Sequence, residues 1–150
     1  TQCYGCNGGL MDYAFKYLQN NGFCEASDYP YHESEGTCEE KKCGDNPKDT
    51  GFHDFSDNPG QIIKGLQDGP VAVAVDATTW THYTGGVMTK EECSENLNHG
   101  VTLVGVSLDK NTPYVLIRNS WGEDWGEEGH IKLTINGACG WDNDASIPTF

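Results

Sequence analysis

The chain has few basic residues and no long apolar run. Lys and Arg number 9 against 23 Asp and Glu, so the formal net charge is −14 at pH 7. Nucleic-acid binding needs clustered Lys and Arg, and no stretch approaches the ~18 apolar residues of a membrane span. We therefore expect no nucleic-acid partner and no membrane partner. The acidic residues indicate either a solvated surface or a surface suited to an acidic compartment.

Internal repeats and low-complexity tracts are also missing, and a length of 150 residues favours one domain. Seven cysteines indicate an oxidised, secretory-pathway protein. The alternative is zinc, because Cys3-x-x-Cys6 has ligand spacing and Cys38 and Cys43 could join His32. No second Cys-x-x-Cys and no paired histidines follow, so we predict no metal and no cofactor.

A helix is predicted near the start of the chain. Apolar residues fall at i, i+3, i+4 and i+7 over residues 11–18, and Gly22 follows as a stop. Residues 25–60 are rich in Gly, Pro and acidic residues, which predicts loops. A short helix over residues 62–66 should end at Gly69-Pro70.

Short β-rich runs fill the remainder. We expect strands at residues 71–76, 101–107, 114–118 and 130–135, with residues 109–113 as a hairpin loop. A helical piece followed by a barrel-like piece is an α+β arrangement, with the boundary near Gly51.

The candidate chemistry lies in Asn98-His99-Gly100 and in Asn119, which follows His99 by twenty residues. A histidine that acts as a general base needs one ring nitrogen facing the reaction and the other held by an acceptor. The Asn119 side-chain oxygen can be that acceptor, and Trp121 can keep water off the bond. The other four histidines have no such partner amide, so we interpret them as surface or packing residues: His32, His53, His82 and His130.

Four motifs spread along the chain resemble papain-family cysteine proteases of the cathepsin L-like type, with protozoan-like features. They are Asn-Ser-Trp-Gly-Glu-Asp-Trp-Gly-Glu-Glu-Gly (119–129), Gly-Cys-Asn-Gly-Gly-Leu-Met-Asp (5–12), Tyr-Pro-Tyr (29–31) and Gly-Pro-Val (69–71). The resemblance implies a papain-like two-lobe fold. Residues 1–51 would be the remainder of a helical left lobe and residues 52–145 an antiparallel β-barrel right lobe. Residues 146–150 would be a strap that returns to the left lobe.

The nucleophilic cysteine of that family lies about 130–150 residues before the histidine. Counting back from His99 places it before Thr1, and none of the seven cysteines precedes a Trp. We therefore expect a fragment that holds the base and its orienting amide without the nucleophile and that is inactive alone. The missing N-terminal segment would be either a separate chain after processing or absent from an incomplete sequence.

The resemblance also implies roles for individual residues. His99 and Asn119 would be catalytic, Trp121 would shield their bond, and Trp125 would be structural. Gly8 and Gly9 would contact the substrate main chain, and Asp144 would be the floor of the pocket for the second residue before the scissile bond. The other expected substrate-binding residues are Leu10, Met11, Ala74, Leu97, Asn98 and Gly100, with Asn98 replacing the Asp common in cathepsin-like members.

Most of the cysteines also receive an assignment from the resemblance. Cys93 with Cys139, and Cys24 with Cys43, would form disulfides. Cys6 and Cys38 would be half-cystines whose partners lie outside the chain, and Cys3 has no assignment.

The resemblance implies a cysteine-type endopeptidase that acts on polypeptides and that cystatin-like or propeptide inhibitors bind. The expected location is the lysosome, the vacuole or the outside of the cell. The alternative is a non-enzymatic papain-fold protein whose nucleophile has been replaced and which serves in binding or assembly. The presence of His99, Asn119 and Trp121 favours the enzyme, because a site that has lost its catalytic function is not constrained to keep these residues.

Overall fold

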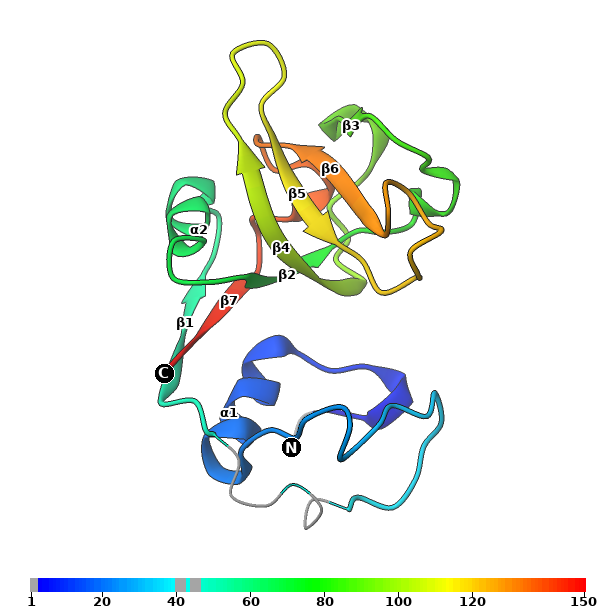
Figure 1. Cartoon of the computed structure of the whole chain (residues 1–150). Helices are drawn as coiled ribbons and strands as arrows, with labels where there is room; N and C mark the ends of the chain where they lie inside the picture. The colour runs from blue at the N-terminus through cyan, green and yellow to red at the C-terminus, as the bar shows by residue number, and fades with distance from the viewer. Residues whose placement is uncertain (1–2, 40–42, 44–46) are drawn as a thin grey trace. The chain divides into compact units, whose positions relative to one another are not determined.

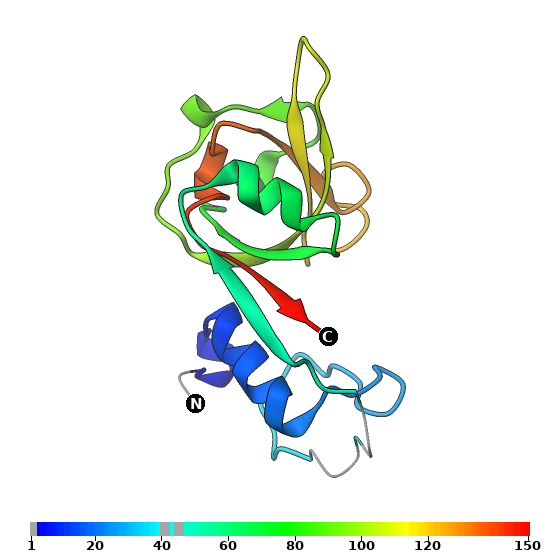
Figure 2. The same cartoon turned by 90° about the vertical axis from the view of Figure 1, so that its left-hand side faces the viewer.

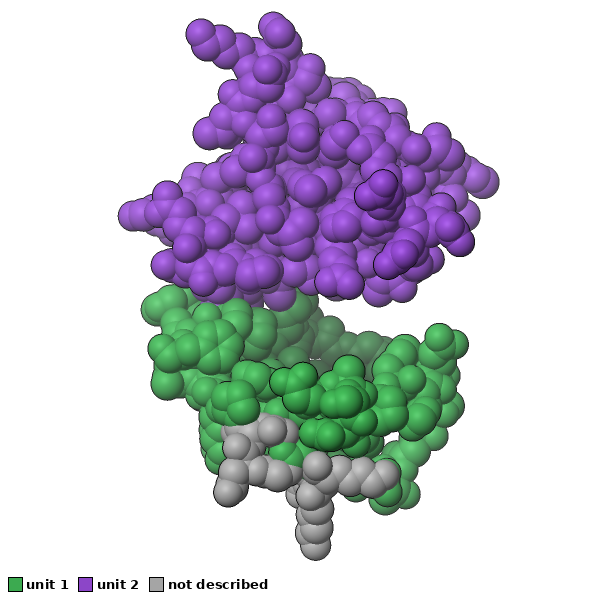
Figure 3. All heavy atoms as spheres, in the orientation of Figure 1, with its two compact units in different colours: residues 1–53, 148–150 green, residues 54–147 purple. Residues whose placement is uncertain are grey.

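The computed structural model describes residues 3–39, 43 and 47–150. The chain divides into two compact units (Figure 3), one of residues 1–53 with 148–150 and one of residues 54–147. The boundaries expected from the sequence, after residues 51 and 145, differ from these by two residues each. In the described parts of the chain, no helix has both the length and the apolar character needed to cross a bilayer.

The first unit is built around helix α1 (Met11–Asn21), which confirms the helix predicted from the apolar period. Gly22 ends the helix at φ 70°, and its N–H donates to the Leu18 carbonyl at 2.8 Å. Such a positive φ is freely open to glycine. On one side of α1, Phe15 lies 6.1 Å from Phe52 between ring centroids. A short 3-10 helix, η1 (Gly5–Asn7), precedes α1.

The prediction of loops throughout residues 25–60 is wrong at its end, because β1 (Gly51–Phe55) is a strand. Near it, the Thr50 N–H donates to the Thr149 carbonyl at 2.7 Å. The glycine and acidic residues of this segment gave no alternation of apolar and polar positions. Its pairing with a distant strand therefore decides its conformation.

The second unit contains one short α-helix and most of the sheet (Figures 1 and 2). Helix α2 (Pro59–Gly65) begins at Asn58, whose side chain accepts from the Gln61 N–H at 3.1 Å, with proline in its first turn. The other strands are β2 (Val71–Val75), β3 (Val87–Met88), β4 (His99–Ser107), β5 (Tyr114–Arg118), β6 (His130–Thr134) and β7 (Ala145–Thr149).

The seven strands form one sheet in the order β1-β7-β2-β4-β5-β6-β3. β4 pairs antiparallel with both β2 and β5, and the β4–β5 hairpin turns through the loop predicted at residues 109–113. The expectation of a wholly antiparallel lobe is wrong at β3, which pairs parallel with β6. The α+β class is confirmed.

The core of the second unit comes from the inward positions of these strands. Val71, Val73 and Val75 are fully buried and alternate with half-buried alanines along β2. Burying a side chain of this size contributes about 1.5–3 kcal/mol. Trp80 and Trp141 are the largest fully buried side chains among the described residues. The sheet is therefore a rigid base for the residues at the ends of β2, β4 and β5.

Candidate catalytic site

The sheet register places the predicted histidine and asparagine beside each other. His99 is the first residue of β4, and Asn119 directly follows the last residue of β5. Because β4 and β5 are antiparallel and Thr102 pairs with Arg118, the start of β4 lies next to the end of β5. On the other side of β4, His99 pairs with Val75 of β2, which is fully buried.

The two side chains form a hydrogen bond, with 2.8 Å between His99 Nε2 and Asn119 Oδ1. An amide oxygen only accepts, so Nε2 carries the proton and Nδ1 is left to exchange a proton with another group. Asn119 is 9% exposed, and its Oδ1 also accepts from the Ser120 N–H at 2.8 Å. The amide therefore fixes the tautomer and the orientation of the imidazole ring.

Two tryptophans contact the His99 ring, and a third packs against both of them. The Trp121 ring stacks on His99 with centroids 5.4 Å apart, and Trp80 meets His99 edge-on at 6.3 Å. Trp125 lies 5.8 Å from Trp80 and 5.2 Å from Trp121, and its indole N–H donates to the Trp80 carbonyl at 3.1 Å. The indole faces keep water from one side of the imidazole. Trp80 was not predicted from the sequence, because a single aromatic residue outside a periodic segment gives no signal.

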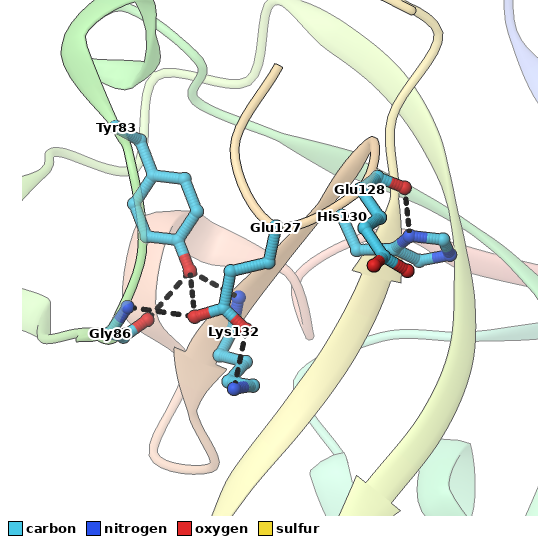
Figure 4. A network of polar contacts seen from close by, with 6 residues as sticks. All are labelled: Tyr83, Gly86, Glu127, Glu128, His130 and Lys132. Carbon is cyan, nitrogen blue, oxygen red and sulfur yellow. Dashed lines mark hydrogen bonds and ion pairs between the residues drawn. The ribbon is translucent and has the colours of Figure 1, made fainter. Parts of the chain in front are cut away.

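A polar network holds the loop that carries Trp121 and Trp125 (Figure 4). Glu127 accepts from the Gly86 N–H at 2.8 Å and forms an ion pair of 2.5 Å with Lys132, while Tyr83 OH donates to the Gly86 carbonyl at 2.6 Å. The bond from Lys132 lowers the pKa of Glu127, and burial raises the pKa of Tyr83. Glu127 is therefore ionised and Tyr83 neutral near pH 7, so the network keeps its donors and acceptors matched.

His130, which the sequence predicts to be a surface or packing residue, lies near this loop (Figure 4). His130 Nδ1 lies 2.8 Å from the Glu128 carbonyl oxygen, to which it donates. This hydrogen bond stabilises the tight turn between Glu128 and His130, which agrees with a packing role for His130.

The predicted substrate-binding residues fall in both units. Gly8, Gly9, Leu10 and Met11 lie consecutively before and at the start of α1 in the first unit. A Cβ at Gly9 would come within 2.7 Å of Cys3 Sγ, so the close approach of Cys3 to this backbone requires glycine.

In the second unit, backbone pairing brings three of the predicted residues together. Ala74 pairs with Gly100 across β2 and β4, and the Ala74 N–H donates to the Asp144 carbonyl at 2.9 Å. Leu97 is 38% exposed and lies close to Gly140. Asn98 accepts from the Ala77 N–H at 3.0 Å, so its amide is engaged in a local network.

Two disulfides are present, Cys24–Cys43 and Cys93–Cys139. Cys3, Cys6 and Cys38 are exposed free thiols. In the residues that the structure describes, no group of three His, Cys, Asp or Glu side chains is placed to hold a metal ion.

Comparison with known proteins agrees with this geometry. The profile of the papain family cysteine proteases matches residues 1–149. Cathepsin L 1 of Paramecium tetraurelia is 48% identical over 136 residues, which are 91% of this chain and 41% of that protein. Cysteine protease XCP2 of Arabidopsis thaliana is 42% identical over 155 residues, 97% of this chain and 43% of that protein.

Solved structures give the same result. The bromelain protease of Ananas comosus, solved with the E64 inhibitor, has a TM-score of 0.89 and 33% identity, covering 98% of this chain and 72% of that one. Procathepsin L 3 of Tenebrio molitor has a TM-score of 0.89 and 34% identity, covering 97% of this chain and 50% of that one. The chain belongs to the papain family of cysteine proteases and has a papain-like fold. It spans less than half the length of these curated relatives.

Proposed function

We propose that this chain is the histidine-bearing part of a cysteine-type endopeptidase. The observation that carries the proposal is the bond of 2.8 Å between His99 Nε2 and Asn119 Oδ1 beneath Trp121. His99 is the general base and acid, Asn119 is its orienting amide, and the nucleophile is a cysteine outside residues 1–150. We assign residues 1–51 to the helical lobe and residues 52–145 to the barrel lobe, with residues 146–150 as the strap.

The reaction begins when the cysteine thiol gives its proton to His99 Nδ1, which forms a thiolate–imidazolium pair. The sulfur attacks the scissile carbonyl carbon, and the C–N bond then breaks as the imidazolium gives its proton to the leaving amine. The products of this half are a thioester and a free amine. Water then attacks the thioester as His99 takes its proton, which releases the carboxylic acid and restores the thiol.

The substrates in this proposal are polypeptides. In the first unit, Gly8 and Gly9 hold the substrate main chain, and Leu10 and Met11 are further substrate-binding residues. In the second unit, the substrate-binding residues are Ala74, Leu97, Asn98, Gly100 and Asp144, and Asp144 is the floor of the pocket for the second residue before the scissile bond. Procathepsin forms stand among the solved relatives, which supports a propeptide as an inhibitory partner. Cystatin-like inhibitors are further expected partners. The two disulfides support a lysosomal, vacuolar or secreted location.

The test is thiol-dependent peptide hydrolysis by a polypeptide that contains these 150 residues together with a nucleophile-bearing segment. His99→Ala should lower kcat by about 10²–10⁴-fold, because it removes the proton carrier. His32→Ala is the matched control, since His32 is exposed in the first unit, and it should keep full activity. Hydrolysis that survives His99→Ala would exclude this mechanism, whereas absence of thiol-dependent hydrolysis by the unmutated protein would favour the non-enzymatic alternative.

A further inference from the structure

Asp76 is a buried carboxylate for which the sequence predicts no role. It follows β2 directly and is 1% exposed. Its Oδ2 accepts from the Ser94 hydroxyl and from the Asn96 N–H at 3.1 Å. Its Oδ1 accepts from the Thr78 N–H at 3.0 Å and from Asn98 Nδ2 at 3.2 Å. Both carboxylate oxygens are therefore fully engaged.

The donors follow a pattern along the chain. Ser94, Asn96 and Asn98 lie at every second position of the segment that leads into β4, and each gives a donor to Asp76. One carboxylate thus fastens the whole segment of residues 94–98 to the end of β2.

Asp76 is ionised in the folded protein. Burial alone would raise its pKa, but hydrogen bonds from Ser94, Thr78 and Asn96 outweigh burial and hold the pKa below its usual value. Its hydrogen-bond partners Ser94, Asn96, Thr78 and Asn98 are all uncharged, and Lys90, which precedes the segment, is paired with Glu95 at 2.5 Å. The acids just before the segment are Glu91 and Glu92, of which Glu92 accepts from the Thr89 N–H at 2.7 Å. The carboxylate is therefore held by hydrogen bonds and not by a cation.

The fastened segment ends at the candidate catalytic histidine. The Asn98 N–H donates to the Val75 carbonyl at 2.9 Å, and Val75 pairs with His99 across β2 and β4. Asp76 is thus one residue beyond the strand partner of His99, and Asn98 is one residue before His99. The Asp76 N–H in turn donates to the Cys139 carbonyl at 2.8 Å, which ties this corner to the Cys93–Cys139 disulfide.

We propose that Asp76 is a positioning residue for His99: by holding Ser94, Asn96 and Asn98, its carboxylate fixes the start of β4 so that the imidazole meets Asn119 in one orientation. This inference rests on the proposed function, because Asp76 affects catalysis only if His99 is the catalytic histidine. Asp76 has no direct contact with the reacting atoms in this role.

The experiment is nitrogen NMR of the histidine rings in the isotopically labelled 150-residue chain, with Asp76→Asn as the variant. An amide has the same shape but places an NH2 group against two donors, so the segment should detach. We expect His99 to change from a single Nε2–H tautomer to a mixture, and its ring N–H to exchange with water at least tenfold faster. His82 and His130 should keep their spectra. An unchanged His99 tautomer in folded Asp76→Asn would overturn the proposal.

Two further variants separate positioning from general loss of stability. Val115→Ala weakens the core on β5, where Val115 is fully buried and pairs with Val106 and Leu133, and it should leave the His99 tautomer intact. If Val115→Ala also mixes the tautomers, the effect is general and the proposal fails. Should Asp76→Asn not fold, Ser94→Ala decides, because it removes one donor and retains the charge. Faster ring N–H exchange in Ser94→Ala supports the proposal, and an exchange rate equal to the parent's refutes it.

The failure of this inference is distinguishable from failure of the proposed function. The ring tautomer is read without any hydrolysis, whereas the function is tested by the His99→Ala assay. If His99→Ala abolishes hydrolysis and Asp76→Asn leaves the His99 tautomer unchanged, the proposed function stands and only the positioning role of Asp76 is refuted.

Discussion

Asn119 uses one oxygen for two hydrogen bonds, accepting from His99 Nε2 at 2.8 Å and from the Ser120 N–H at 2.8 Å. The bond from its own neighbour's N–H holds the amide plane, so the imidazole meets an acceptor that is already oriented. Asn119 Nδ2 is buried and has no hydrogen-bond partner among the described residues. The acceptor oxygen is therefore the atom through which this side chain acts on His99.

Replacing Asn119 by Ala should cost less than replacing His99, because it removes orientation and leaves the proton carrier. The loss of one hydrogen bond to a neutral amide corresponds to about tenfold in kcat. Asn119→Asp retains an acceptor and should lose less than Asn119→Ala. Steady-state kinetics on a nucleophile-containing form measures both, and an Asn119→Ala variant as impaired as His99→Ala would contradict the orienting role.

The disulfide between Cys93 and Cys139 should dominate the redox sensitivity of the second unit. It joins residues 46 apart, and Cys139 Sγ also accepts from the Trp80 indole N–H at 3.4 Å. Closing a loop of this length contributes about 4 kcal/mol in the chain-entropy model. Cys93→Ser should therefore lower the denaturation midpoint strongly, whereas Cys38→Ser, an exposed free thiol, should not.

Peptide mapping without reduction checks the covalent pattern itself. Fragments linked through Cys93–Cys139 and Cys24–Cys43 are expected, with three cysteines open to alkylation. Metal bound at Cys24 or Cys43 would contradict this assignment.

The candidate site was largely predictable because its chemistry lies in short motifs. His99 and Asn119 each carry a functional group, and their family context gave both positions. Asp76 gave no comparable signal, because an acid after a buried strand usually faces solvent. Three of its four donors come from residues 94–98, about twenty positions away, and only the β2–β4 pairing brings them to it.

The fold was predictable where the pattern is local. The period of α1 and the alternation of β2 both follow from side chains within one segment. β1 and β7 were not predicted, since β1 contains Gly51 and Asp54 and β7 contains Pro148, which all disfavour strands. Pairing between segments nearly a hundred residues apart overrides those propensities in β1 and β7. β3 has two residues, which is too short for an alternating pattern, and it is paired with β6 about 45 residues further along the chain.

Asp49 should be a source of instability at neutral pH. It is 4% exposed, and neither carboxylate oxygen has a hydrogen-bond partner among the described residues. Burial raises its pKa, so the folded state binds the proton more tightly than the unfolded state does. The ionised Asp49 therefore destabilises the folded state fully at pH values above the folded-state pKa. This destabilisation disappears as the pH falls below the unfolded-state pKa of about 3.9.

Asp49→Asn is accordingly expected to raise the free energy of unfolding by about 1 kcal/mol at pH 7 and to give no gain near pH 3. Urea denaturation at the two pH values measures the difference. Asp28→Asn, at an exposed position of the same unit, is the control and should change neither value. A gain at pH 3 equal to that at pH 7 would show that charge burial is not the cause.

Asp144 is expected to set substrate preference at the second residue before the scissile bond. Its carbonyl accepts from the Ala74 N–H at 2.9 Å, and Ala74 pairs with Gly100. Asp144, Ala74 and Gly100, all predicted pocket residues, are therefore neighbours. The expected wall is apolar, and burial of a substrate leucine there contributes about 1.5–3 kcal/mol. An ionised Asp144 at the far end can also meet the head group of arginine, whose stem lies along the same wall. The expected preference is therefore dual, for Leu and for Arg.

The comparison that decides this is hydrolysis of matched Leu and Arg substrates by a nucleophile-containing form with Asp144→Ala. A charge-assisted bond contributes about 1.5–3 kcal/mol, so the Arg/Leu ratio of kcat/KM should fall at least about tenfold. Asp68→Ala, an exposed acid just after α2, serves as the control and should leave the ratio intact. A ratio that Asp144→Ala does not alter means that this side chain is not in the pocket, and specificity must then come from the apolar wall alone.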